Sequence, residues 1–335
     1  MRLGLCKTGC VDPFRNLALE RYLLENVGQD EVILYLWQNQ STVVIGRNQS
    51  ALAECRIQKL KEDGGRLARR LSGGGAVFHD LGNLNFTFLA PSHLFSEEKQ
   101  TEVILKAVRS LGIEAQRTGR NDLLAGGCKF SGHAYYHSKG RSYHHGTLLV
   151  RTDAEKMAAY LNPSPLKLAA KGVSSVKSRV CNLCDFVPEL SIEVMQDALE
   201  QSFSEVYGET VSPVSLSVDD QAAIERIGEE FASEDWILKG ERPLRNSREG
   251  RFDWGCVRLD WDELQGSFGS VALFSDGLDA GFLEAVPNAL VGCCVERNAI
   301  ERALSALVGP TPGFTAKEKR QWAADIASLV CSGRF

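Results

Sequence analysis

The pattern of hydrophobic and polar positions divides the first two thirds of the chain into helices and strands. Apolar residues recur at helical spacing from Pro13 to Val27, and Asp12 before Pro13 is typical of a helix start. The same spacing predicts helices over residues 54–62, 97–111 and 191–206. Runs of β-branched and aromatic residues predict two paired strands at Val32–Trp37 and Thr42–Ile45, a strand at Asn85–Leu89, and three short strands within 121–150 that include a hairpin turn at Ser138–Arg141.

The pattern changes between Lys239 and Gly250. This stretch, KGERPLRNSREG, is charged and lacks apolar periodicity, as is typical of a linker. Beyond it, the sequence predicts two strands around Gly266 and helices over residues 279–286, 296–307 and 315–330. We therefore expect a large domain over residues 1–242 and a small α+β domain over residues 250–335.

Composition narrows the class of protein. The chain has 335 residues, of which 44% are hydrophobic, so it can build substantial cores. Its 38 basic and 43 acidic residues give a net charge of −5, which argues against nucleic acid as a partner. The N-terminus has no apolar run of signal-peptide length, and no segment approaches the roughly eighteen apolar residues of a membrane-spanning helix. A cytoplasmic protein without a membrane partner is expected.

Cysteine and histidine spacing does not predict a metal site. The ten cysteines are scattered, so reduced thiols are expected, and the Cys181-x-x-Cys184 pair has no second pair or nearby histidines to complete a zinc site. Four histidines fall on the predicted hairpin, but strand alternation places them on opposite faces. Surface or ligand-lining positions are therefore expected for His133, His137, His144 and His145.

The segment from Arg69 to Leu89, RRLSGGGAVFHDLGNLNFTFL, combines two arginines with three consecutive glycines. Adjacent glycines permit a sharp turn that offers bare backbone N–H groups to an anion or a flat ring, and Arg70 adds a charge suited to phosphate or carboxylate. The alternative is a glycine turn between two strands with solvated arginines. A second segment, Lys167–Leu183, carries four basic residues, and either a mobile phosphate-handling loop or a solvated connector is consistent with it.

Taken together, these motifs resemble the bacterial lipoate-protein ligases over nearly the whole chain. The resemblance rests on RRLSGGGAVFHDLGN at 69–83, GRNDL at 119–123, KFSG at 129–132, HHGTLL at 144–149 and KGVSSVKSRV at 171–180, with FDWG at 252–255 and FSDGL at 274–278 resembling the accessory domain of the family. It implies a biotin/lipoate ligase-like α+β catalytic domain with a mixed, largely antiparallel sheet, followed by the small α+β accessory domain.

The resemblance also implies a two-step reaction with ATP and (R)-lipoate as substrates. The lipoate carboxylate attacks the α-phosphate of ATP to give lipoyl-AMP and pyrophosphate, and an acceptor lysine then displaces AMP. Two anions must meet in the first step, so a cation is required between them, and Lys129 is the candidate catalytic residue.

The remaining candidate residues follow from the same resemblance. Besides Lys129, the expected ATP-binding residues are Arg70, Gly75, Ala76, Val77, Phe78 and Asp122. Asp122 is a candidate Mg²⁺ ligand, and its alternative is capping a turn. The expected lipoate-binding residues are Lys129, Val44, Gly74, Val77, His79 and His145, and the loop closing over the adenylate would use Lys171, Gly172, Ser175 and Arg179. The implied acceptors are lipoyl domains of 2-oxoacid dehydrogenase acyltransferase subunits and the glycine-cleavage H protein, and a monomer is expected.

Three other functions compete with this interpretation. An octanoyl transferase of the same superfamily would need a cysteine thioester, for which Cys181 and Cys184 are candidates. A biotin ligase shares the chemistry, but its arginine–glycine signature is not found here. A silent lipoate-binding protein would have no use for Arg70, Lys129 and the basic loop.

Overall fold

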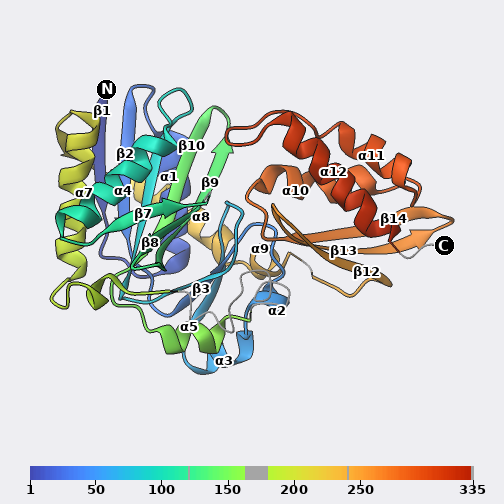
Figure 1. Ribbon diagram of the computed structural model, residues 1–335, viewed down its shortest axis with the longest axis horizontal. Coiled ribbons are helices and arrows are strands. Elements are labelled where there is room, and N and C mark those ends of the chain that lie inside the picture. The colour runs from blue at the N-terminus through green and yellow to red at the C-terminus, as the bar shows by residue number, and fades with distance from the viewer. Residues whose placement is uncertain (120, 163–179, 240, 333–335) are drawn as a thin grey trace.

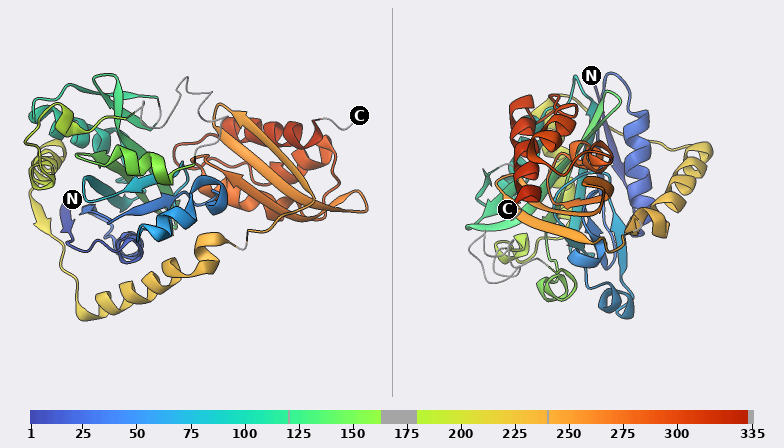
Figure 2. Two further views of the ribbon diagram at one scale, coloured as in Figure 1. Left: turned by 90° about the horizontal axis from the view of Figure 1, so that it is seen from below. Right: turned by 90° about the vertical axis from the view of Figure 1, so that its right-hand side faces the viewer.

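The computed structural model describes residues 1–119, 121–162, 180–239 and 241–332. The chain forms an N-terminal part, up to residue 239, and a smaller C-terminal part that begins with strand β12 at Asn246 (Figure 1). Helices α8 (Val218–Ala232) and α9 (Glu234–Leu238) lead from the first part to the second (Figure 2). No helix within the described ranges is long and apolar enough to cross a membrane.

An eight-stranded sheet forms the centre of the N-terminal part, in the order β11-β1-β2-β6-β10-β9-β8-β7. Only β1 pairs in parallel, with β2 and β11, and the other neighbours are antiparallel, as expected from the resemblance. The strands are β1 (Arg2–Lys7), β2 (Glu31–Trp37), β6 (Asn83–Pro91), β7 (Ala115–Thr118), β8 (Asp122–Ala125), β9 (Cys128–Ser138), β10 (Arg141–Leu149) and β11 (Val211–Pro213).

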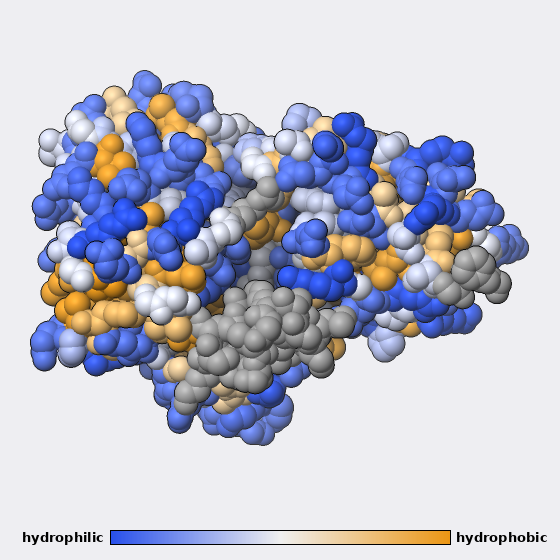
Figure 3. Space-filling view, in the orientation of Figure 1, coloured by the Kyte–Doolittle hydropathy of each residue, from blue (hydrophilic) through white to orange (hydrophobic). Residues whose placement is uncertain are grey.

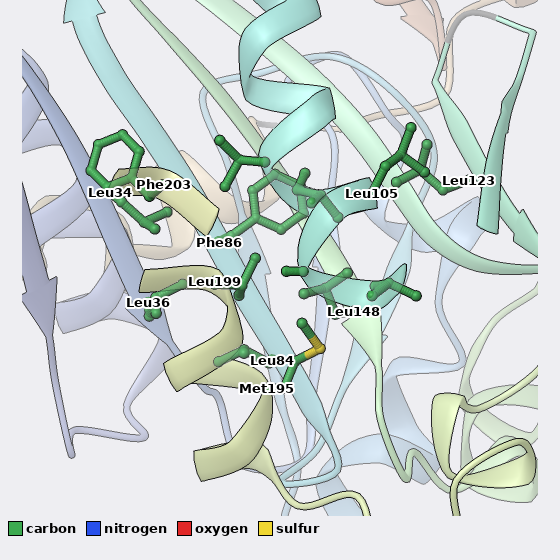
Figure 4. Packing of buried hydrophobic residues seen from close by; sticks show 14 of the residues in the cluster. Leu34, Leu36, Leu84, Phe86, Leu105, Leu123, Leu148, Met195, Leu199 and Phe203 are labelled. Carbon is green, nitrogen blue, oxygen red and sulfur yellow. The ribbon is translucent and has the colours of Figure 1, made fainter. Parts of the chain in front are cut away.

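Helices cover both faces of this sheet. The helices α4 (Glu97–Ser110) and α7 (Ile192–Tyr207) pack on one face, where side chains such as Phe86, Leu148 and Phe203 form the main core (Figure 4). Helix α1 (Pro13–Asn26) and α8 cover part of the other face. The predicted starts of α1 and α7 are confirmed, because Asp12 and Ser191 accept hydrogen bonds from the first free N–H groups of these helices.

The predicted pairing of Val32–Trp37 with Thr42–Ile45 is wrong. Strand β3 (Thr42–Ile45) instead lies between β4 (Arg66–Arg69) and β5 (Val77–His79) in a separate three-stranded sheet. All four residues of β3 are buried, so alternation gives no indication of its partner. The predicted helix over 54–62 is also divided, into α2 (Ala51–Glu54) and α3 (Ile57–Glu62), because Cys55 pairs in extended conformation with Leu161 just beyond α5 (Ala154–Tyr160).

The hairpin of β9 and β10 is confirmed at its turn but not in its length. Lys139 and Gly140 both have positive φ, at 48° and 73°, as a tight two-residue turn requires. The strands are not short: β9 has 11 residues and β10 has nine. Their length arises from pairing along both edges, since β10 lies between β6 and β9.

The C-terminal part contains an antiparallel sheet of β12 (Asn246–Phe252), β13 (Gly255–Leu264) and β14 (Ser267–Ser275), covered by α10 (Ala280–Leu290), α11 (Arg297–Ser305) and α12 (Ala316–Cys331). The turn at Gly266 and the three helices are confirmed. The expected linker over 239–250 is wrong in its second half, because strand β12 begins at Asn246 and pairs along its length with β13. Its polarity reflects an edge strand in which three of the seven residues are exposed and none is fully buried.

Candidate active site

A cavity of about 1060 Å³ lies between the two parts of the protein. Part of the hollow between them is visible on the face shown in Figure 3. The N-terminal part lines the cavity with the glycine segment and strands β9 and β10, and the C-terminal part adds the β12–β13 turn and α12. Of the predicted ligand residues within the described ranges, all line this cavity: Val44, Arg70, Gly74, Gly75, Ala76, Val77, Phe78, His79, Asp122, Lys129 and His145.

Both arginines that precede the glycines are buried, so the alternative with solvated arginines is wrong. Arg69 is 1% exposed and Arg70 5% exposed. The Arg70 guanidinium donates to Ser72 Oγ at 3.0 Å and to the carbonyl oxygens of Val44, Gly73 and Gly75 at 3.2, 2.7 and 2.9 Å. Burial lowers the pKa of Arg70 to about 10, so its charge is retained at neutral pH. Its donors therefore hold the glycine segment in shape.

The glycine residues are needed at two positions by close contacts. A Cβ on Gly73 would lie 2.3 Å from Gly277 O, and Gly74, with φ of 91°, donates its N–H to the same oxygen at 3.2 Å. A Cβ on Gly75 would meet no atom of the described residues within 4 Å, and Gly75 lines the cavity. The segment is thus packed on one side against the C-terminal part and open to the cavity on the other.

A chain of buried polar groups connects this segment with helix α1. Ser72 Oγ lies 2.7 Å from His145 Nε2, and His145 Nδ1 lies 2.8 Å from Glu20 Oε1. Arg70 donates to Ser72 Oγ, and the His145 ring bridges this hydroxyl and the Glu20 carboxylate through its two nitrogens. Arg70 lies at one end of this chain of hydrogen bonds and Glu20 at the other. His145 therefore positions the segment while also lining the cavity.

Lys129 and Asp122 form an ion pair at 2.7 Å on the cavity face of the sheet, each side chain about one quarter exposed. A β-bulge brings them together: Lys129 pairs with Leu124 and Ser131 with Leu123, so Phe130 is an extra residue. Without it, alternation would place Lys129 on the same face as Ser131, towards the main core. Gly132 leaves the required room, since a Cβ there would lie 2.7 Å from Lys129 Nζ.

The candidate loop residues Lys171, Gly172, Ser175 and Arg179 lie outside the described residues. The chain returns beside the candidate catalytic lysine, because Val180 forms a parallel bridge with Lys129 and Cys181 donates its N–H to Lys129 O at 3.0 Å. Burial raises the pKa of Cys181 to about 11. A thiol held protonated in this way is a poor nucleophile, which argues against a thioester mechanism at Cys181.

The expectation for the hairpin histidines holds for three of the four, since His137 is only half-buried near the end of β9. His145 lines the cavity, and His133 borders it. His144, however, is fully buried beneath the sheet, where its Nε2 lies 2.9 Å from His133 Nδ1 and its Nδ1 lies 3.2 Å from Gln100 Oε1. Burial lowers the pKa of His133 to about 3, and that of His144 well below its usual range. No group of three or more His, Cys, Asp or Glu side chains in the described ranges is arranged to hold a metal ion.

Several residues that line the cavity were not predicted from the sequence. Trp37 and Asn85 are 2% and 1% exposed and line the deeply buried part of the cavity, its inner end, whereas Trp254 and Asp325 belong to the wall from the C-terminal part. Glu20, which supports His145, had a usable signal: it is an acid on the apolar face of the predicted first helix. The wall from the C-terminal part had no such signal, because it depends on how the two parts meet.

Comparison with known proteins agrees with this architecture. The family model "Lipoyl protein ligase A/B catalytic domain" matches residues 12–204, and "Bacterial lipoate protein ligase C-terminus" matches residues 243–321. Lipoate-protein ligase A of Psychrobacter cryohalolentis is 38% identical over 325 residues, covering 95% of this chain and 96% of that protein.

Two solved structures share the fold. LipL1 of P. falciparum in complex with lipoate has a TM-score of 0.81 and 26% identity, covering 97% of this chain and 99% of that one. A lipoate-protein ligase A bound with ATP has a TM-score of 0.62 and 28% identity, covering 71% and 98%. The fold and its cavity thus define an α+β enzyme of the biotin/lipoate ligase-like class. Within this class, the chain belongs to the lipoate-protein ligase family and is a ligase.

Proposed function

We propose that this enzyme activates free lipoate with ATP to form lipoyl-AMP and pyrophosphate, and then transfers the lipoyl group to a lysine of a carrier protein with release of AMP. The observation that carries the proposal is the position of Lys129, whose ammonium group lies over Gly132 inside the cavity. The same cavity is lined by Trp37 and His79 and by the apolar side chains of Phe78, Leu149 and Met157, which suit a flat base. Lipoate- and ATP-bound relatives support both substrates.

In this mechanism Lys129 lies between the two reacting anions. Its charge would reduce the repulsion between the lipoate carboxylate and the α-phosphate, and would stabilise the negative charge that builds up as the bond forms. The ion pair with Asp122 holds the ammonium group in position. Backbone N–H groups of Gly75 and Ala76, shaped by Arg70, are the proposed nucleotide contacts.

Asp122 is also the proposed protein ligand for Mg²⁺. Its carboxylate is a hard oxygen donor inside the cavity, and Mg²⁺ is commonly held by one or two carboxylates together with substrate phosphates. This arrangement is compatible with the finding that the described residues offer no larger cluster of metal ligands. When bound, the ion would neutralise triphosphate charge and so favour departure of pyrophosphate.

The proposed acceptors are the lipoyl domains of 2-oxoacid dehydrogenase acyltransferase subunits and the glycine-cleavage H protein. Family membership supports a lipoyl-carrying protein as acceptor. The proposal extends to a monomeric enzyme with a catalytic domain over residues 1–242 and an accessory domain that begins with β12 at Asn246 rather than at residue 250, and both domains line the cavity.

The direct test is pyrophosphate release from ATP in the presence of lipoate. We expect wild type to release pyrophosphate, and Lys129→Ala to lower kcat by about 10²–10³-fold, because one preorganised charge contact in the transition state is lost. The exposed Lys156→Ala variant on α5 is the matched control and should retain the wild-type rate. Wild-type protein that binds lipoate but releases no pyrophosphate would disprove the proposed function.

A further inference from the structure

Two buried hydrogen-bond donors at the inner end of the cavity have no partner in the part of the chain that the structure describes. Asn39 Oδ1 accepts from Asn16, so Asn39 donates from Nδ2 to His79 Nδ1 at 3.1 Å, and the neutral His79 carries its proton on Nε2. Asn85 Oδ1 accepts from Asn83 Nδ2 at 2.9 Å, and neither His79 Nε2 nor Asn85 Nδ2 has a hydrogen-bond partner among the described residues, although the two residues are only 3% and 1% exposed. Both line the cavity. Buried donors are nearly always paired, so these two point to a ligand atom.

The donors lie together around Trp37. The Trp37 and His79 rings are 6.0 Å apart, and Trp37 is the register partner of Asn85 across β2 and β6. The indole N–H of Trp37 donates to Thr87 Oγ1 at 3.1 Å. The inner end is therefore an aromatic surface flanked by two unpaired N–H groups.

The register of the strands gives the distance between this end of the cavity and the Lys129 ammonium group. Asn85 pairs with Thr147 on β10, and Gly132 on β9 donates its N–H to Thr147 Oγ1 at 3.4 Å. The Lys129 ammonium lies over Gly132, so two strand spacings, roughly 10 Å, separate it from Asn85. An extended eight-carbon acid with its carboxylate at Lys129 thus reaches Asn85 with its far end.

We propose that Asn85, with His79, is a specificity-determining residue that recognises the dithiolane sulfurs of lipoate and disfavours plain fatty acids such as octanoate. Sulfur is a weak acceptor, but it offers these donors a partner. The hydrocarbon end of octanoate offers none and leaves both donors buried and unpaired, which is how a polar site rejects an analogue that lacks the matching group. The inference rests on the proposed function for the orientation of the acid in the cavity.

The test measures binding of lipoate and of octanoate by calorimetry without nucleotide. Wild type should prefer lipoate, and Asn85→Leu, which removes the donor at similar volume, should reduce that preference by about fivefold, as expected for one hydrogen bond. Thr152→Val is the matched control, because it removes a buried, unpartnered hydroxyl from a residue that does not line the cavity. It should leave the preference unchanged.

Asn85→Ala provides a second variant in case the leucine disturbs folding, and should shift the preference in the same direction. An unchanged preference in the folded variants, or no preference in wild type, would overturn the inference. Because the assay contains no ATP, its outcome is separate from that of the ligase reaction. If the protein binds lipoate selectively but releases no pyrophosphate, the result supports the specificity site and disproves the proposed ligase reaction.

Discussion

Arg69 and Arg70 adjoin in the sequence, but their guanidinium groups bind different sets of carbonyl oxygens. Arg69 donates to the backbone of Gly46, Arg47 and Gln49 and to that of Trp236 and Ile237, so it ties the β3 end to α9. Arg70 shapes the glycine segment. At the scale of single residues, the site thus depends on buried charges whose hydrogen bonds are almost all made to backbone, which offsets the cost of their burial.

The buried histidines predict how stability depends on pH. His144 stays neutral when folded, because its pKa is well below the usual range, whereas the unfolded chain takes up a proton below about pH 6.5. Stability therefore falls as pH falls from that value. In urea unfolding at pH 7 and pH 5, His144→Asn should lose about 2 kcal/mol less than wild type between the two. Equal losses for the two proteins would contradict the prediction.

At the scale of elements, the β9 bulge decides which face carries the candidate catalytic lysine. Its extra residue, Phe130, packs into the main core, and Lys129 consequently reaches the cavity above Gly132. The same strand therefore contributes to the core and to the site. A bulge used in this way redirects a side chain without interrupting the sheet.

Gly132→Ala tests this arrangement. The new methyl group would lie 2.7 Å from Lys129 Nζ, and since that atom is the end of a flexible side chain, the ammonium should move while the fold remains. We expect kcat/KM for pyrophosphate release to fall by about ten- to a hundredfold, as small misplacements of catalytic groups do. Thermal unfolding should change little. Gly269→Ala on β14, where a Cβ meets no atom closer than 3.4 Å, is the control, and equal activity of both variants would refute the role of Gly132.

At the scale of the whole molecule, a cluster of charges joins the two parts beside the cavity. Glu284 on α10 accepts three hydrogen bonds from Arg47, at 3.0, 3.2 and 2.8 Å, and contacts Lys239 Nζ at 3.2 Å. Arg47 also stacks over the Trp236 ring, 4.4 Å from its centre. Burial, assisted by Arg47, lowers the pKa of Lys239 to about 8, and the basic neighbours hold the pKa of Glu284 below its usual range.

Glu284→Gln should loosen this junction, because two cations are left without their anion. We expect tryptic cleavage between residues 239 and 246 to accelerate by about threefold at low salt, consistent with a partly exposed pair, and the effect to shrink at high salt. Glu301→Gln is the matched control, since the ion pair of Glu301 with Arg297, at 3.9 Å, lies within α11. Equal cleavage of both variants would show that this cluster does not hold the parts together.

Local sequence was sufficient for much of the fold. Caps such as Asp12 and Ser191, the Lys139–Gly140 turn and the C-terminal helices follow from spacing and from residues with special backbone preferences. The glycine segment and the candidate Lys129 were found through motif resemblance, which carries information that periodicity does not. The predictions that failed, the partner of β3 and the linker over β12, also failed for local reasons. Strand β3 is buried throughout and β12 is an edge strand, so neither has the alternation that identifies a strand and its partner.

The sequence alone therefore determined the family, the order of most elements and the residues of the glycine segment, because these depend on neighbours in the chain. Only the tertiary structure decided the face on which Lys129 lies, the burial of both arginines and the inner end formed by Trp37, His79 and Asn85. Those features join strands far apart in sequence, and a bulge of one residue reverses which face a side chain occupies.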